Sequence, residues 1–134
     1  MNNCTHNRAS ASSVPSLVNA DAIPNELKRL PNWVNWRERL RNGRPTKIPC
    51  QPNGRPAKAN DPVTWSTFDE AWAAYVASPS GFSGVGYVFG KDDPYCGVDL
   101  DACLRRGTRL MTPWAKQVLE SIRSYTEIRP QELG

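Results

Sequence analysis

The chain has 134 residues, a length that suits one domain with a buried core and is short for two. Its five tryptophans, four tyrosines and three phenylalanines supply large side chains for a core, while 12 prolines and 22% charged residues indicate long polar loops. We find no run of about 18 apolar residues, which argues against a transmembrane helix, and no secretory signal at the start. We therefore expect a cytoplasmic protein.

The net charge of +4 is modest but unevenly distributed along the chain. Between Lys28 and Lys58, nine basic residues stand against one acid, Glu38. Between Asp61 and Asp101 the balance inverts, with seven acids against one base. An enzyme that holds a polyanion on one surface and metal ions on another has this pattern, and so does an ordinary polarised surface.

The four cysteines are scattered and include no C-x-x-C pair, and His6 is the only histidine. This composition argues against a zinc site, and disulfides are uncommon in cytosolic proteins. We expect reduced thiols that pack as small apolar side chains.

The first half of the chain predicts a tail, a short helix and a hairpin. Residues 1–21 are rich in Asn, Ser and Ala and predict a flexible tail, so that the folded part spans 22–134. A helical segment over 23–30 ends at Pro31. A strand over 33–37 is followed by a turn at Asn42-Gly43 and by an edge strand over 47–50, in which Pro49 cannot donate to a central ladder.

The second half predicts two helices and three strands. Thr67 and Glu70 form a capping box at the start of one helix, and Thr112 followed by Pro113 marks the start of another. The segments 85–89 and 95–101 are expected to form an antiparallel hairpin, and 124–128 a further strand.

The motif that suggests chemistry is Val98-Asp99-Leu100-Asp101. In a strand, Val98 and Leu100 would enter a core while the two aspartates would project together from the other face, with Cα atoms about 6.5 to 7 Å apart. Carboxylates at this spacing can bind one divalent ion, or a pair of ions about 3.5 to 4 Å apart as in two-metal phosphoryl transfer. Two solvated acids at a strand end would show the same pattern.

The order of motifs resembles the bifunctional primase-polymerase domain of phages, plasmids and integrated elements, which is of the archaeo-eukaryotic primase type. The matching segments are IPNELKRLPNWVNWR, GRPTKIP, NDPVTWSTFDEAWAAY, GVGYVFGKDDPYCGVDLDAC and PWAKQVLESIRSYTEI. They run in order over about four fifths of the chain, from 23 to 128. The resemblance implies an incomplete α+β domain of the primase-like (RRM-like) kind, with a mixed or antiparallel sheet packed by helices.

The same resemblance implies the site. Asp99 and Asp101 would be the catalytic residues and would hold Mg²⁺ or Mn²⁺. Arg37 and Lys47 are candidates for binding the nucleotide or the template, although a generic basic surface would explain both. The implied partners are a DNA template, nucleoside triphosphates and a replicative helicase in the intact protein. Most of the tryptophans fall at core periodicity, so we expect core packing rather than base stacking from them.

The end of the sequence departs from the family pattern. Members of the family continue with a segment like S-P-S-G-T-G and later carry a basic residue and a further acid, whereas this chain reads R-P-Q-E-L-G over 129–134. The codons TCG CCC TCA GGA ACT GGG, read one nucleotide later, encode R-P-Q-E-L-G. The sequence thus suggests a C-terminally truncated domain and a frameshifted tail.

Two functions follow as alternatives. The first is a DNA primase and polymerase that transfers nucleotides on a template, inactive or partial in this chain. The second is a non-catalytic remnant that binds nucleic acid through its basic residues. A metal-dependent nuclease is a weaker idea, since no E/D-x-K pattern follows Asp101.

Overall fold

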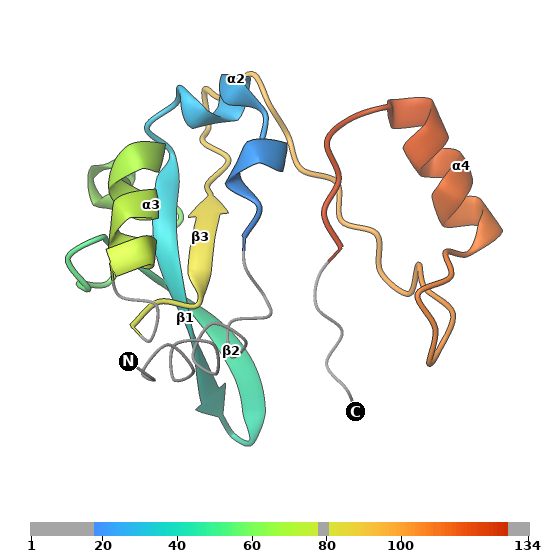
Figure 1. Ribbon diagram of the computed structural model, residues 1–134, viewed down its shortest axis with the longest axis horizontal. Coiled ribbons are helices and arrows are strands. Elements are labelled where there is room, and N and C mark those ends of the chain that lie inside the picture. Colours follow the sequence, from blue (N-terminus) through green and yellow to red (C-terminus); the bar gives the residue numbers. More distant parts are fainter. Residues whose placement is uncertain (1–17, 78–80, 129–134) are drawn as a thin grey trace, which may run out of the picture. The chain divides into compact units, whose positions relative to one another are not determined.

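The computed structural model describes residues 18–77 and 81–128. The chain forms two compact units, one reaching to Asp93 and the other beginning at Pro94. In Figure 1 the first unit is a small sheet with a helix against it, and the second holds one helix among irregular segments. Among the described residues, no helix combines the length and the apolar character that crossing a membrane requires.

A three-stranded antiparallel sheet organises the first unit. Its order is β2-β1-β3, with β1 (Trp33–Arg41) between β2 (Arg44–Cys50) and β3 (Gly84–Tyr87). The expected strand over 33–37 is confirmed and is four residues longer, and the expected edge strand is confirmed as part of β2. The α+β class is also confirmed.

The turn between β1 and β2 forms at Asn42-Gly43, as the sequence predicts. Asn42 has φ 51° and Gly43 has φ 74°. Positive φ at both central residues is the requirement of the two-residue hairpin turn whose twist matches that of the strands. Beyond Trp36, β1 pairs with β2 alone, because its register with β3 covers only Trp33 to Trp36. The β1–β2 hairpin therefore extends past the rest of the sheet (Figure 1).

Helix α3 (Phe68–Ala77) covers one face of the sheet and begins at the predicted capping box. The amide of Thr67 donates to Glu70 Oε2, and the amide of Glu70 donates to Thr67 Oγ1, both at 3.2 Å. These two bonds satisfy amides that the first turn of a helix leaves without intrahelical partners.

The core of the first unit lies between α3 and the sheet. One cluster contains Ile23, Trp33, Phe68 and Ala71, with the Trp33 and Phe68 rings edge to face at 4.9 Å between centroids. A second cluster contains Cys50, Tyr75 and Phe82. Cys50 is buried, as expected of a thiol that packs as a small apolar side chain, whereas Cys96 is exposed and does not fit that expectation. Cys50, Cys96 and Cys103 are free thiols.

Short helical segments precede the sheet. A 3₁₀ turn (Ala20–Ala22) leads into α2 (Asn25–Lys28), which is shorter than the helix expected over 23–30. Val18 and Ala20, within the expected tail over 1–21, pack against the first core cluster. The rest of that expected tail lies outside the described residues.

The expected hairpin of 85–89 with 95–101 is wrong. Residues 95–101 form no strand, and β3 pairs instead with β1. The expected strand over 124–128 does not form either. Alternation of apolar and polar residues predicts which way side chains would point if the segment were a strand. It does not show that a neighbouring strand is present to accept and donate the backbone hydrogen bonds.

The second unit contains α4 (Pro113–Ile122), which starts after Thr112 with Pro113 at its first position, as expected. The Thr112 side chain makes no capping hydrogen bond, so the predicted cap is confirmed in position but not in its side-chain contact. The helix ends at Arg123, whose φ of 51° is left-handed. Ala115 is fully buried, whereas Trp114 is 48% exposed.

Candidate functional site

Asp99 and Asp101 lie in an irregular segment of the second unit. Both side chains are exposed, and Asp101 starts a turn in which Ala102 has a left-handed φ of 53°. Val98 is 62% exposed, which contradicts its expected place in a core. Because the segment is not a strand, the alternation argument does not place the two carboxylates on one face.

Exposure leaves both carboxylates able to meet an ion or a ligand from solvent. Among the described residues, no group of three or more His, Cys, Asp or Glu side chains is arranged to hold a metal ion. Asp99 and Asp101 therefore do not belong to a larger ligand cluster in the described part of the chain. Magnesium is commonly held by one or two carboxylates together with substrate phosphates and water, so a pair of acids fits this ion.

A small hairpin follows the aspartates directly. The Thr112 amide donates to the Cys103 carbonyl at 2.8 Å, and the Arg105 amide donates to the Leu110 carbonyl at 2.9 Å. Its tip turns at Gly107, which has φ 70°. The hairpin carries three exposed arginines: Arg105, Arg106 and Arg109.

Sequence reasoning missed these arginines. The run R-R-G-T-R, with a glycine between cations, is a turn signal that could have revealed them. Exposed arginines that follow two acids along the chain suit phosphate oxygens, since each guanidinium can donate two parallel hydrogen bonds.

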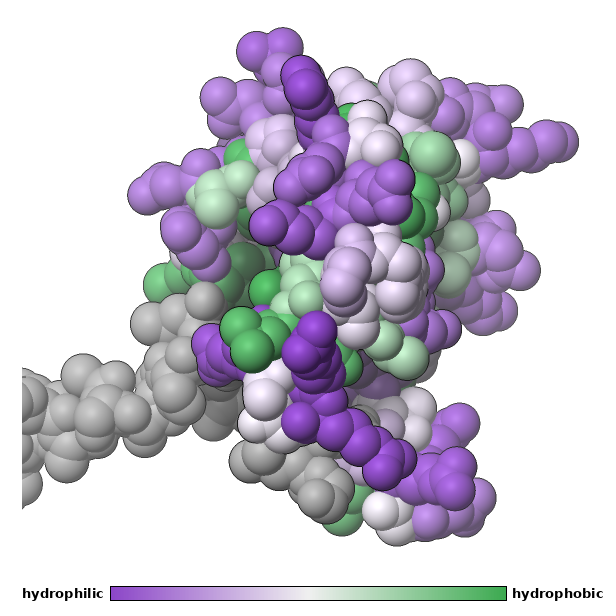
Figure 2. Space-filling model, turned by 90° about the vertical axis from the view of Figure 1, so that its right-hand side faces the viewer, coloured by the Kyte–Doolittle hydropathy of each residue, from purple (hydrophilic) through white to green (hydrophobic). Residues whose placement is uncertain are grey.

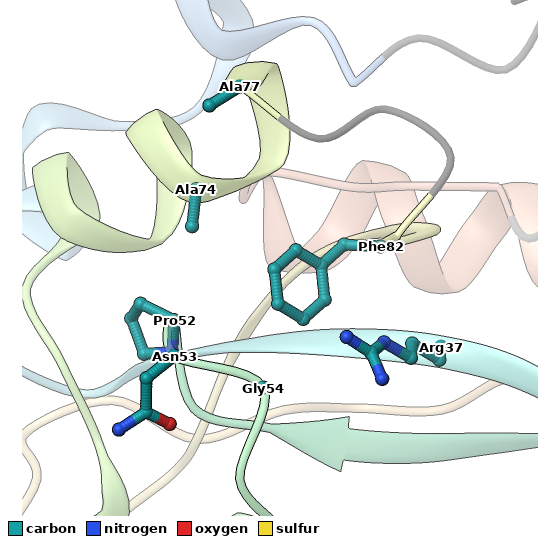
Figure 3. A pocket seen from close by; sticks show the side chains of 7 residues that line it. All are labelled: Arg37, Pro52, Asn53, Gly54, Ala74, Ala77 and Phe82. Carbon is teal, nitrogen blue, oxygen red and sulfur yellow. The ribbon is translucent and has the colours of Figure 1, made fainter.

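Arg37 lines a hollow of about 310 Å³ in the first unit, shown in Figure 3. Its guanidinium carbon lies 4.8 Å from the centroid of the Phe82 ring, and its buried Nε has no hydrogen-bond partner among the described residues. The other residues around the hollow are Pro52, Asn53, Gly54, Ala74 and Ala77. Ala74 and Ala77 belong to α3, so Arg37 points to the helix side of the sheet.

Lys47 points to the other side of the sheet. It pairs with Glu38 in the ladder, one residue away from Arg37, and successive strand residues face opposite ways. Its Nζ lies 4.5 Å from the centroid of the Trp36 ring. The structure therefore does not bring the two basic candidates together.

A small polar network orders the end of the first unit. The Asn32 amide donates to Asp93 Oδ2 at 3.2 Å and to the Val88 carbonyl at 3.1 Å, and the Tyr87 hydroxyl donates to the same Asp93 oxygen. These bonds join the segment before β1 to the loop after β3, and the Asp93 carboxylate accepts two of them while the Val88 carbonyl accepts the third.

The pKa of Tyr125 is clearly displaced. Partial burial, together with the hydrogen bond to Glu127 and the charge of that carboxylate, raises the pKa of the Tyr125 phenol well above its ordinary value. The phenol therefore keeps its proton to a higher pH than an ordinary tyrosine does. Hydrophilic residues cover much of the face drawn in Figure 2, with hydrophobic residues among them.

The chain is similar to a phage DNA primase-polymerase. It is 43% identical over 109 residues, or 81% of its length, to the DNA primase-polymerase of Nitratiruptor phage NrS-1. The match covers 14% of that phage protein. The chain matches no model of a protein family. The resemblance drawn from the order of the motifs is confirmed, and the chain is a relative of part of a phage DNA primase-polymerase.

Proposed function

We propose that this chain is part of a template-dependent DNA primase-polymerase, in which Asp99 and Asp101 hold Mg²⁺ or Mn²⁺. The observation that carries the proposal is the 43% identity over 81% of the chain to a protein named for this activity. It is supported by the exposure of both aspartates and by the arginines that follow them. The fold proposed for the whole domain is of the archaeo-eukaryotic primase type.

Each group would then have a role that its chemistry suits. The carboxylates would hold the ion, which when bound neutralises charge on the triphosphate and favours ionisation of the attacking hydroxyl. Arg105, Arg106 and Arg109 would hold phosphate oxygens by paired hydrogen bonds. In the intact protein, the partners would be a DNA template, nucleoside triphosphates and a replicative helicase.

Primer synthesis on a single-stranded template, with nucleotides and either Mg²⁺ or Mn²⁺, tests this proposal. Asp99→Asn and Asp101→Asn should each lower synthesis by about 100-fold or more, since a catalytic ion supplies several kcal/mol of transition-state stabilisation. Asp92→Asn is the matched control, because it removes the same charge from another exposed acid. Unchanged synthesis in the Asp99 and Asp101 variants would contradict the assignment.

A second candidate is a non-catalytic module that binds nucleic acid. The observation that favours it is the β1–β2 hairpin, which extends past the sheet and carries exposed Arg39, Arg41, Arg44 and Lys47 against Glu38. Binding that weakens steeply with salt, without primer synthesis under any metal condition, would favour this candidate over the polymerase.

A further inference from the structure

The β1–β2 hairpin has two faces, and the ladder assigns each residue to one of them. Asn35 points to the side of α3, where its Nδ2 donates to the Ala71 carbonyl at 2.9 Å. Every second residue of β1 after Asn35 lies on this same face, and so does the residue of β2 directly opposite each of them. The face therefore carries a row of four arginines, here called the arginine row: Arg37, Arg39, Arg41 and Arg44.

The opposite face of the hairpin carries its acid. Glu38 pairs with Lys47 in the ladder, and the Lys47 Nζ lies 4.5 Å from the centroid of the Trp36 ring. On this face a negative charge stands beside the positive one. The side of the arginine row has no acid between 37 and 48, where its other members are Thr46 and Ile48. Unbalanced positive charge thus gathers on one face of the hairpin.

The arginine row has no counter-ion within the described part of the chain. None of its guanidinium groups forms an ion pair with a described residue. Arg39, Arg41 and Arg44 are exposed, as a surface for an external ligand requires. The Nε of Arg37 is buried and has no hydrogen-bond partner among the described residues.

The two arginines beside the turn oppose each other. Arg41 pairs with Arg44 in the ladder, and like charges at directly opposite positions destabilise a hairpin. Folding alone does not explain this pair, because its repulsion weakens the fold. A bound anion would remove the repulsion, so the pair is consistent with a ligand that carries negative charge.

The length of the arginine row indicates a ligand with several anionic groups. Its three members on β1 follow one another at two-residue spacing, about 6.5 to 7 Å between Cα atoms, so they span about 13 Å. One small anion does not reach all of them. The row also lies on the part of the hairpin that extends past β3, whose pairing with β1 ends at Trp36 (Figure 1).

We propose that the arginine row binds the phosphate backbone of a nucleic-acid strand. This inference rests on the proposed function and assigns the backbone contact to one face of one hairpin. Guanidinium groups donate paired hydrogen bonds to phosphate oxygens, and a nucleic acid presents such phosphates in a series. Binding is independent of base sequence, because phosphate contacts do not read the bases.

Fluorescence anisotropy of a labelled dT15 strand, titrated with the chain at several salt concentrations, tests the arginine row. Arg39→Gln and Arg41→Gln should each weaken binding and reduce the slope of log affinity against log salt by about 0.7, the value for one phosphate contact on a single strand. The same change should appear with a strand of mixed sequence. Arg39→Lys retains the charge and should retain most of the slope.

Two further variants remove one positive charge elsewhere in the first unit. Lys47→Gln acts on the opposite face of the same hairpin, and its effect on the slope should be less than half that of Arg39→Gln. Arg29→Gln removes an exposed charge outside the hairpin and should leave the slope unchanged. Thermal unfolding separates binding from folding defects. Arg41→Gln should be no less stable than the unsubstituted chain, because it relieves the repulsion with Arg44.

The outcomes separate the two proposals. If the unsubstituted chain binds dT15 while Arg39→Gln and Arg41→Gln keep its affinity and slope, the arginine row is overturned and the proposed function stands. Equal effects of Lys47→Gln and Arg39→Gln would also overturn the row, since net charge alone would then explain binding.

A different ligand class is tested by competition. Polyglutamate that displaces dT15 as effectively as unlabelled dT15 does would assign the row to an acidic peptide and overturn the nucleic-acid inference. Binding that depends on the arginines, without primer synthesis under any metal condition, would support the row and contradict the polymerase.

Discussion

Asn35 is a fully buried polar residue in the middle of the sheet. Its Nδ2 donates to the Ala71 carbonyl at 2.9 Å, while its Oδ1 has no partner among the described residues. The side chain links β1 to α3. A polar group at such a position needs its hydrogen bond, because water does not replace the lost partner.

We therefore expect Asn35→Ala to lower the free energy of unfolding by about 1–3 kcal/mol. Asn35→Asp should be more damaging at neutral pH, because a carboxylate cannot donate to the Ala71 carbonyl and its charge would be buried. Urea unfolding followed by tryptophan fluorescence measures both effects. Asn60→Ala, at an exposed position, is the control and should change little; an equal change in Asn35→Ala and Asn60→Ala would refute the role of this link.

At the level of single residues, the sequence proposed candidate ligands without their geometry. Asp99 and Asp101 were proposed from the h-D-h-D pattern, and their role as metal ligands stays a prediction; both side chains are exposed. The prediction that Val98 lies in a core was wrong, because it depended on a strand that does not form. Trp36 was grouped with the core tryptophans because periodicity does not show which face of a sheet a helix covers.

Helix α3 is the element whose start is best defined by local sequence. Thr67 and Glu70 exchange two hydrogen bonds, so the cap depends on residues three apart and not on distant contacts. This independence explains why the capping box could be predicted from the sequence. The Asn42-Gly43 turn was predictable for the same reason, since positive φ is a property of the turn residues themselves.

The cap gives a prediction for the whole helix. Thr67→Ala removes the hydroxyl that accepts from the Glu70 amide and should destabilise the first unit by about 0.5–2 kcal/mol. Thr67→Ser retains an acceptor and should recover most of that loss. Denaturant midpoints of the two variants measure the effect, and a Thr67→Ala midpoint equal to that of the unsubstituted chain would show that the cap adds no stability.

Strands were less predictable than helix starts because their partners lie far apart in the chain. β3 pairs with β1 across about fifty residues, and no local signal distinguishes this pairing from a hairpin with 95–101. The residues 95–101 alternate as well as a strand does, yet they are not paired. Which strands pair depends on the assembled sheet, so it is not predictable from the local sequence of one segment.

At the scale of the molecule, the candidate functions divide between the two units. The carboxylates and the arginine hairpin belong to the unit that begins at Pro94, and the β1–β2 hairpin with its basic residues belongs to the unit that reaches to Asp93. Both core clusters and all three strands lie in the first unit. The first unit thus has its own hydrophobic core, which is the physical requirement for folding alone.

We therefore expect a chain of residues 18–93 to fold without the rest. Trp33, Phe68 and Tyr75 would be buried in it as they are in the full chain, because each packs against residues of the same unit. The shortened chain should unfold in one cooperative urea transition, since a small domain with a continuous core behaves as a single unit. A gradual loss of fluorescence signal, without a transition, would mean that residues from Pro94 on are needed to complete this core.

If the shortened chain folds, Thr67→Ala should lower its free energy of unfolding by the same amount as in the full chain. The reason is that the cap contacts only residues that both chains contain.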